Sequence, residues 1–159
     1  MSKRLDVVGI GNAMVDAIIP SDREEVEKHQ INRDSMNLIN EELKIQLHKN
    51  YHIKEMIGGG SLGNSMFGIT SFGGNGSFIG KIKNDDVGNF LQKDMISEGL
   101  QFPLGFSSPD ISTGCCTIFV EENGTRTMCT FLGAGSLIGP EDIHKEQIIN
   151  HKIAYLEGY

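Results

Sequence analysis

Apolar and polar positions along the chain follow a strand-like pattern in four stretches. Residues 5–10 form an apolar run that ends in glycines, which is typical of a buried strand. Residues 14–20 predict a second extended segment that stops at Pro20, and residues 76–82 and 153–157 predict two further strands. All four are short enough to be strands of a sheet in a globular protein.

Helical periodicity marks four other stretches, and residues that favour helix ends flank several of them. Asn40 is a suitable N-cap for the first, Gly99 follows the clearest apolar stripe, and Pro140 falls in the first turn of the last. The expected helices are 41–49, 61–72, 84–99 and 139–150. Their alternation with the strands favours the α/β class, with a mainly parallel sheet flanked by helices.

Residues 112–131 carry the clearest hairpin signal. Two runs rich in β-branched and apolar residues flank Asn123 and Gly124, a pair that favours a tight hairpin turn. Residues 21–37 are polar with scattered apolar positions, and there we expect a loop and a short strand. The chain therefore combines alternating strands and helices with hairpin structure.

Net charge and cysteine spacing narrow the classes of function. The net charge of -7 argues against general nucleic-acid binding, which usually needs a basic face. No apolar run approaches the roughly 20 residues of a membrane span. Cys115, Cys116 and Cys129 fit the reduced thiols of a cytoplasmic protein better than a disulfide framework, and their spacing matches no metal site. We therefore expect a cytoplasmic protein without nucleic-acid or membrane partners.

Glycine is enriched, and a triplet at 58–60 precedes an expected helix. In isolation, such a triplet is more often a tight turn than a binding site. Gly9 and Gly11 match the start of a dinucleotide fingerprint, but Met14 stands where its third glycine would be. The glycines alone therefore assign no function.

Five motifs in order along the chain resemble the ribokinase-like (PfkB) family of carbohydrate and nucleoside kinases, and its adenosine-kinase-like branch in particular. They are VVGIGNAMVDAI from residue 7, GGGSLGNSM from residue 58, FGGNGSFIGKIKNDDVGNFL from residue 72, STGCCTIFVEENGTRTM from residue 112 and LEGY from residue 156. They resemble the family's first strand and substrate segment, its Gly-Gly-x-x-x-Asn helix start, a strand-loop-helix, the lid hairpin and a carboxylate-bearing strand. The resemblance spans essentially the whole chain and implies a partial ribokinase-like α/β fold with a small β lid.

The resemblance implies a substrate site built mainly from the first two motifs. Asp16 would accept hydrogen bonds from neighbouring sugar hydroxyls, while Asn12 and Asn64 would each donate and accept. Gly59 and Gly60 would let the sugar approach the backbone closely at the start of the helix. Without the resemblance, each of these residues has a structural interpretation as a turn, a helix cap or a solvated side chain.

Two further residues have roles that the resemblance implies. Glu157 would be a second substrate carboxylate, and Arg126, on the hairpin, would contact a nucleotide phosphate. The partner would be a small-molecule sugar or nucleoside, adenosine-like or ribose-like, and the complete enzyme would use ATP and Mg2+. Leu62, Gly63 and Met66 replace small or polar residues common in the family's asparagine motif, which predicts a differently shaped substrate pocket.

Chain length sets the expected domain organisation. Family members are considerably longer, and their other half carries an Asp-Thr-x-Gly-Ala-Gly-Asp motif that includes the catalytic base. The nearest string here is GAGS at 133–136, which lacks both aspartates. We therefore expect 1–159 to be the amino-terminal half of one kinase domain, inactive alone, with lid strands near 12–20, 31–38 and 111–130.

Two other interpretations stay open. In one, the chain is a non-catalytic module that binds a sugar or nucleoside, or that forms a homodimer through the β lid, as the lids of some family members do. In the other, it is a truncated piece whose exposed apolar edge promotes aggregation. Ligand binding and oligomeric state distinguish these interpretations from the kinase hypothesis.

Overall fold

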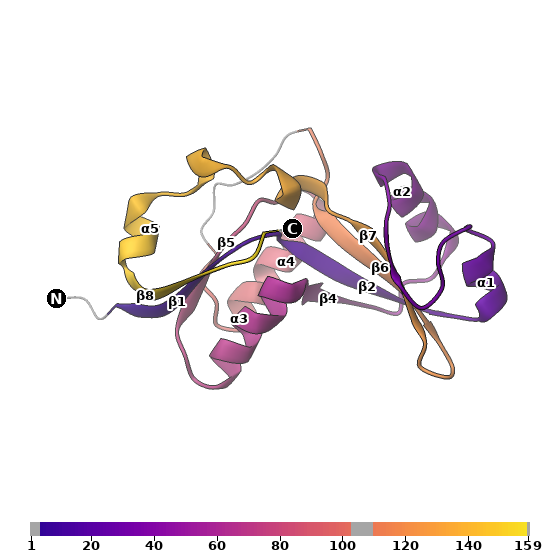
Figure 1. The fold of residues 1–159 in the computed structure, drawn as a ribbon, viewed down its shortest axis with the longest axis horizontal. Helices are drawn as coiled ribbons and strands as arrows, with labels where there is room; N and C mark the ends of the chain where they lie inside the picture. Colours follow the sequence, from indigo (N-terminus) through magenta and orange to yellow (C-terminus); the bar gives the residue numbers. More distant parts are fainter. Residues whose placement is uncertain (1–3, 103–109, 159) are drawn as a thin grey trace.

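The computed structural model describes residues 4–102 and 110–158, and within them the backbone forms two sheets (Figure 1). One sheet has the strand order β5-β1-β8 and the other has the order β3-β7-β6-β2-β4. The strands are β1 (Leu5–Ile10), β2 (Met14–Ser21), β3 (Met36–Leu38), β4 (Glu55–Gly59), β5 (Gly76–Ile79), β6 (Gly114–Glu121), β7 (Arg126–Phe131) and β8 (His151–Leu156). The helices are α1 (Arg23–Glu27), α2 (Glu41–Asn50), α3 (Ser61–Ser71), α4 (Asp86–Ser97) and α5 (Lys145–Ile149), with 3-10 turns η1 (Gly133–Leu137) and η2 (Pro140–Asp142).

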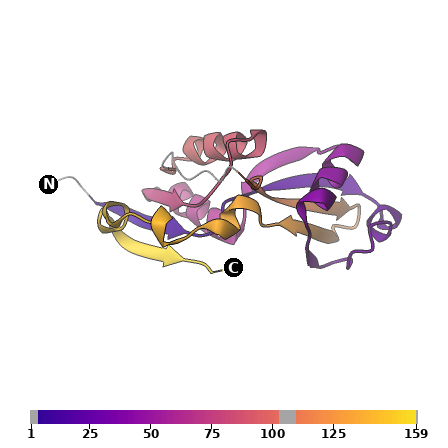
Figure 2. The same ribbon diagram turned by 90° about the horizontal axis from the view of Figure 1, so that it is seen from above.

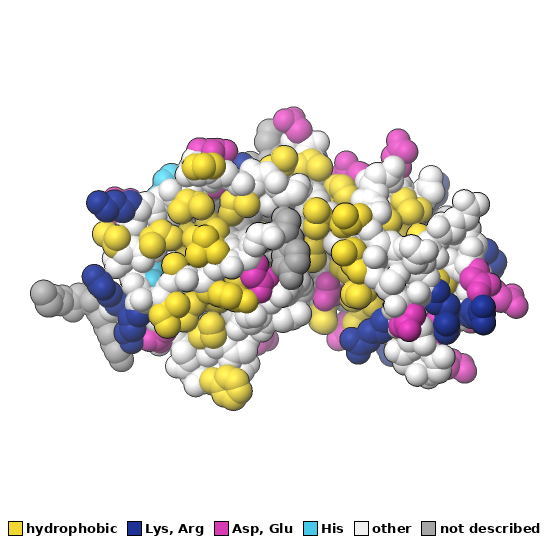
Figure 3. Space-filling view, viewed as in Figure 1, with side chains coloured by type: hydrophobic (Ala, Val, Ile, Leu, Met, Phe, Trp, Pro, Cys, Tyr) yellow, Lys and Arg dark blue, Asp and Glu magenta, His cyan; other side chains and the backbone are white. Residues whose placement is uncertain are grey.

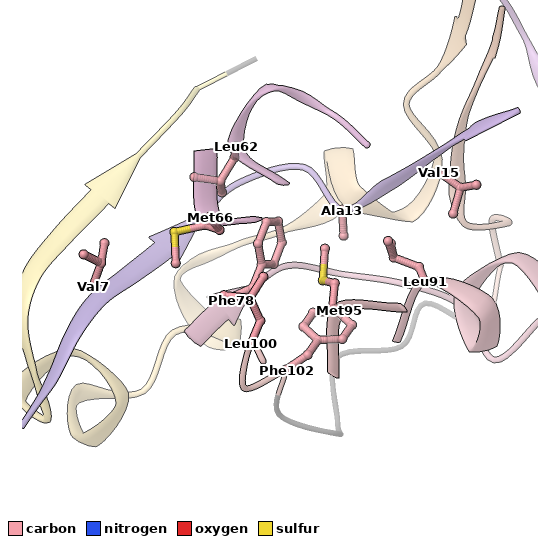
Figure 4. Close-up of a cluster of buried hydrophobic side chains, with 10 residues drawn as sticks. All are labelled: Val7, Ala13, Val15, Leu62, Met66, Phe78, Leu91, Met95, Leu100 and Phe102. Atoms are coloured by element: carbon pink, nitrogen blue, oxygen red, sulfur yellow. The ribbon is translucent and has the colours of Figure 1, made fainter. Parts of the chain in front are cut away.

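The β5-β1-β8 sheet is parallel and is packed on both faces of its central strand. Val7 joins a cluster with residues of α3 and α4, drawn in Figure 4, that includes Met66 and Leu91. Val8 and Ile10 point the other way and pack with Ile79 against the segment 138–148. In Figure 2, α4 lies on one side of β1 and the yellow strand β8 lies on the other side. The continuous burial of residues 7–10 is what the apolar run of β1 predicts for a central parallel strand.

The five-stranded sheet is mixed and is covered by helices on one face. β2 and β6 pair in parallel along their whole length, whereas β6 and β7 form an antiparallel hairpin. Ile19, Phe119 and Cys129 pack on this face with Val26 of α1 and Leu47 of α2. The opposite face carries Asp16 and Cys116 and is turned toward the first sheet. The sheet therefore has one structural face and one face available to a ligand.

Several expected elements are confirmed, together with their end signals. The Oδ1 atom of Asn40 accepts a hydrogen bond of 2.9 Å from the backbone N–H of Leu43 at the start of α2. Gly99 follows the end of α4 with a φ of 84°, in the left-handed region that favours glycine at a helix end. Gly124 has a φ of 86°, as the hairpin turn requires. These signals are local, which is why the sequence alone could place them.

Four expectations about secondary structure were wrong. β2 continues one residue past Pro20, and the glycine triplet contributes to a strand, β4, that was not expected at all. α1 was also missed, although Asp22 and Glu25 form a capping box at its start. The expected helix 139–150 is interrupted, because Ile143 is extended between η2 and α5.

The two sheets are held together where the chain crosses between them. Thr113, just before β6, donates its N–H to Oδ2 of Asp85 at 3.0 Å and its hydroxyl to Oδ1 at 2.7 Å. The N–H of Lys83 donates to the same hydroxyl oxygen at 3.0 Å. These bonds fix the hairpin sheet to the loop between β5 and α4. In the described ranges, no helix is long and apolar enough to cross a bilayer.

Candidate functional site

A cavity of about 500 Å3 lies between the two sheets, and the polar residues that line it come from separate parts of the chain. Asn12 lies between β1 and β2, Asp16 lies on β2, Ser61 and Asn64 lie in the first turn of α3, and Glu157 follows β8. Because β1 and β8 are parallel, their carboxyl ends open toward the same cavity. This placement is the one expected for a ligand site in an α/β sheet.

Asp16 lies in the middle of the open sheet face. Register pairs it with Ile57 of β4 and Cys116 of β6, so it stands in an otherwise uncharged row of side chains. Among the residues that the structure describes, none makes a hydrogen bond to its carboxylate. Burial raises the pKa of Asp16 because the charged form is partly desolvated. The side chain is thus a partly buried acceptor without a partner, which is suited to ligand hydroxyl groups.

Gly59 makes room for Asp16. A Cβ atom on Gly59 would overlap the carboxyl group of Asp16, so only glycine fits this position of β4. Gly59 itself does not line the cavity. The glycine was expected to let a sugar approach the backbone, and the structure instead places the Asp16 side chain against it.

Gly60 sets the direction of α3. Its φ of 80° is in the left-handed region that favours glycine, and a Cβ atom there would lie 2.9 Å from Cγ of Met14. No side chain caps the helix that follows. Asn64 lies one turn further along, exposed at the edge of the cavity, and its backbone N–H donates to the carbonyl of Gly60 at 3.0 Å. The helix therefore presents its N-terminal backbone amides and the Asn64 amide at the site.

Asn12 is the least satisfied polar group of the cavity. Its Oδ1 and Nδ2 atoms are both buried, and neither has a hydrogen-bond partner in the described part of the chain. A Cβ atom on Gly135 of η1 would overlap the Oδ1 atom, so the absent side chain of Gly135 leaves space for this amide. An unpaired buried amide costs about 1–3 kcal/mol, and a polar ligand group would offset that loss.

Glu157 connects the end of β8 to the start of α3. Its backbone N–H donates to the carbonyl of Ile10 at 3.2 Å, and its Oε1 accepts from the hydroxyl of Ser61 at 3.0 Å and from that of Tyr155. Ser61 and Tyr155 were not expected from the sequence. Serine at the first helical position and tyrosine two residues before the glutamate are common in structural roles, so they carried no signal of their own.

Two of the predicted site residues do not line the cavity: Gly59, which packs against Asp16, and Arg126. The structure brings Asn12, Asp16, Gly60, Asn64 and Glu157 to one cavity, but Arg126 is exposed at the start of β7 and does not line it. Arg126 pairs in register with Val120 near the hairpin turn. Its contact with a nucleotide phosphate stays a prediction.

The lid side of the cavity is apolar, which sequence reasoning did not anticipate. Side chains from β3, β6 and β7 form this wall, and Met36 and Leu38 are 55% and 66% exposed. Ile118 and Met128, which pair across the hairpin, also belong to this wall, and Cys116 and Thr130 line the cavity from the same two strands. Alternation along three short strands gave this face too little pattern to distinguish it from the opposite one.

The cysteines divide between the two faces of the lid sheet. Cys116 lines the cavity, and its Sγ accepts a hydrogen bond of 3.3 Å from the hydroxyl of Thr130. Burial raises the pKa of Cys116 to about 11 and those of Cys115 and Cys129 to about 12. All three are free thiols. Within residues 4–102 and 110–158, no cluster of three or more His, Cys, Asp or Glu side chains is placed to hold a metal ion.

A parallel sheet whose carboxyl edge meets a separate β sheet across a cavity with both polar and apolar walls defines the ribokinase-like class of α/β proteins. The model of the pfkB family of carbohydrate kinases matches residues 4–158. The chain therefore belongs to the pfkB carbohydrate kinase family, as its motifs predicted.

Solved structures of kinases share the fold. A probable sugar kinase from Rhizobium etli superposes with a TM-score of 0.85 and 31% identity, over 97% of this chain and 47% of that one. The adenosine kinase of Sinorhizobium meliloti gives a TM-score of 0.85 and 34% identity, over 96% of this chain and 47% of that one. The bifunctional ribokinase/ribose-5-phosphate isomerase A of Fructilactobacillus sanfranciscensis is 27% identical over 95% of this chain and 26% of its own length. The chain thus spans about half the length of the solved relatives and about a quarter of the curated one.

Proposed function

We propose that this chain is the acceptor-binding part of an ATP-dependent kinase that transfers the γ-phosphate to a hydroxyl group of a sugar or nucleoside. One observation carries the proposal: Asn12, Asp16, Asn64 and Glu157, from four separate segments, line one cavity. The family and the sugar and adenosine kinase neighbours support it. The domain assignment follows, with 1–159 as the amino-terminal half and lid strands near 12–20, 31–38 and 111–130.

Each polar residue has a distinct role in holding the acceptor. The Asp16 carboxylate accepts from two neighbouring hydroxyls, because it has two free oxygens and no described partner. The Asn12 and Asn64 amides donate and accept, which matches hydroxyl groups that do both. Gly60 aims the amides of α3 at the same place. Together these groups bind and orient the acceptor, which is the part of phosphoryl transfer that positioning supplies.

The described residues do not provide the rest of the phosphoryl-transfer machinery. Mg2+ supplies charge neutralisation on the phosphates in this chemistry, but no described cluster of acidic side chains fits a metal, and Arg126 lies outside the cavity. We therefore assign ATP and Mg2+ to the complete kinase and expect the isolated chain to be inactive. The three free cysteines support a reducing, cytoplasmic location.

Calorimetry with adenosine and D-ribose tests acceptor binding, and a coupled ATP-turnover assay tests inactivity. We expect saturable binding of at least one ligand and its loss in Asp16→Asn. Glu122→Gln is the matched control, because Glu122 is an exposed carboxylate outside the cavity. Binding of neither ligand contradicts the acceptor-site proposal, and robust turnover contradicts the proposed inactivity.

A second candidate function is a binding or dimerisation module that uses the lid. Met36 and Leu38 on the edge strand β3 are more than half exposed, and exposed apolar edges favour pairing with another copy. Size-exclusion chromatography with light scattering tests this candidate. A dimer that binds neither ligand and dissociates in Leu38→Lys favours the module, whereas a ligand-binding monomer favours the kinase half.

A further inference from the structure

The charged side chains of the cavity are all of one sign. Among the described residues that line it, Asp16 and Glu157 carry charge, and no lysine, arginine or histidine is present. In Figure 3, acidic side chains are visible at the hollow between the two sheets. This one-sided arrangement indicates what kind of ligand the site takes.

We propose that Asp16 and Glu157 make the cavity selective for a neutral, unphosphorylated polyhydroxyl acceptor and reject phosphorylated sugars and nucleotides. The inference rests on the proposed function and deepens it, because it specifies the charge class of the acceptor. Hydroxyl groups satisfy both carboxylates as donors. A phosphate monoester brings nearly two negative charges and donates little, so it meets repulsion in a partly desolvated site.

The nearby cations are engaged elsewhere and do not offset this charge. Lys81 pairs with Asp142 at 2.9 Å. Lys44 is buried against the ring of Phe131, on the opposite sheet face from Asp16, and its Nζ donates to Ser112 at 3.2 Å. Neither side chain lines the cavity. The field inside the cavity is therefore set mainly by its own two carboxylates.

The start of α3 is the feature that would favour an anion, and Glu157 already occupies it. Helix N-termini attract negative groups through their free amides and dipole. Glu157 lies against this end, with Oε1 bonded to the hydroxyl of Ser61 in the first turn and to that of Tyr155 on β8. The two bonds hold the carboxylate at the rim and prevent it from turning into solvent. An incoming phosphate would have to displace a fixed charge of the same sign.

Paired ligands that differ only by a phosphate test the inference. Calorimetry at low salt compares D-ribose with D-ribose 5-phosphate and adenosine with AMP. We expect the neutral member of each pair to bind at least roughly tenfold more tightly. The ratio should shrink at high salt, because screening weakens the repulsion. Equal or tighter binding of a phosphorylated ligand would overturn the proposal.

Two variants that each replace a glutamate with glutamine distinguish the effect of charge inside the cavity from the effect of the protein's net charge. Glu157→Gln should lower the discrimination ratio several-fold, whereas Glu122→Gln, which changes the net charge equally at an exposed position outside the cavity, should leave it unchanged. An unchanged ratio in Glu157→Gln, or an equal change in both variants, contradicts the assignment.

A second readout requires no ligand. Cys116 lines the cavity, so its modification by cationic, neutral and anionic methanethiosulfonate reagents reports the local potential, with the modified site mapped by mass spectrometry. We expect the cationic reagent to react faster than the anionic one, and Glu157→Gln to narrow that difference. An anionic reagent that reacts as fast as the cationic one overturns the inference. The expected labelling without adenosine or ribose binding would contradict the proposed function alone.

Discussion

Gly59 and Asp16 share one space: the α-carbon of Gly59 on β4 lies where the carboxyl group of Asp16 on β2 leaves no room for a side chain. Gly59→Ala should therefore displace Asp16 or the edge strand, destabilising the fold by about 1–3 kcal/mol and abolishing ligand binding. Chemical denaturation and calorimetry measure the two effects. Replacing Asp16 with serine in the same chain should restore stability but not binding.

Gly68 provides the matched control for that substitution. It lies inside α3, and a Cβ atom there meets nothing within 4 Å. Gly68→Ala should stabilise the protein by about 0.5–1 kcal/mol, because alanine restricts the unfolded chain and favours the helix. Equal destabilisation by Gly59→Ala and Gly68→Ala would contradict the shared space of Gly59 and Asp16.

Asp16→Asn should stabilise the protein at neutral pH while weakening ligand binding. Burial raises the pKa of Asp16 above its unfolded value of 3.8, so the folded state retains a proton between the two pKa values. Across that window the folded state binds more protons than the unfolded state, and stability falls as pH rises. Asp16→Asn removes this loss of stability, because asparagine does not ionise. Its gain in melting temperature should therefore be present at neutral pH and disappear in acid, and a gain that grows in acid would contradict the sign.

Thr113→Val should loosen the junction between the two sheets. It removes the hydroxyl that donates to Asp85 and accepts from the N–H of Lys83, leaving a partly buried carboxylate with fewer donors. We expect a loss of about 1–3 kcal/mol in the free energy of unfolding. Thr70→Val is the control, because the hydroxyl of Thr70 donates to the carbonyl of Phe67 within its own helix. Losses of equal size would count against a special role for the junction.

The three thiols should react slowly in the native protein and unequally with one another. Burial raises the pKa of each cysteine to about 11 or 12, so the thiolate fraction at neutral pH is very small. Cys116 should react first because it lines the cavity, and a bound acceptor should slow its reaction. Mass spectrometry after timed alkylation resolves the order. Faster reaction of Cys115 or Cys129 would contradict the exposure of the two sheet faces.

The sequence predicted best what is fixed by neighbouring residues. Asn40, Gly99 and Gly124 each act within a few positions of the chain, and each lies at the helix end or turn that its residue type favours. The sequence did not predict β4, because Gly58 and Gly59 are poor strand residues in isolation and become extended only by pairing with β2.

The site was predictable as a set of residues but not as an arrangement. Motif resemblance named Asn12, Asp16 and Glu157, and these residues line one cavity. The supporting contacts of Ser61, Tyr155 and Gly135 arise from tertiary packing, which a single sequence does not encode in any local pattern. The same holds for the role of Gly59, which is steric and depends on a strand that the pattern did not show.

Asn12 and Glu157 line one cavity although they lie near opposite ends of the chain, and this has a consequence for local unfolding. Among the strands in residues 4–102 and 110–158, β8 pairs only with β1, and a strand with one neighbour belongs to the part of a sheet that opens most readily. A ligand bound by both Asn12 and Glu157 would link the segment after β1 to the segment after β8. Hydrogen exchange of the backbone amides in residues 151–156 should then slow when the ligand is bound. The exchange rate of β8 would therefore report how much of the protein has ligand in the cavity.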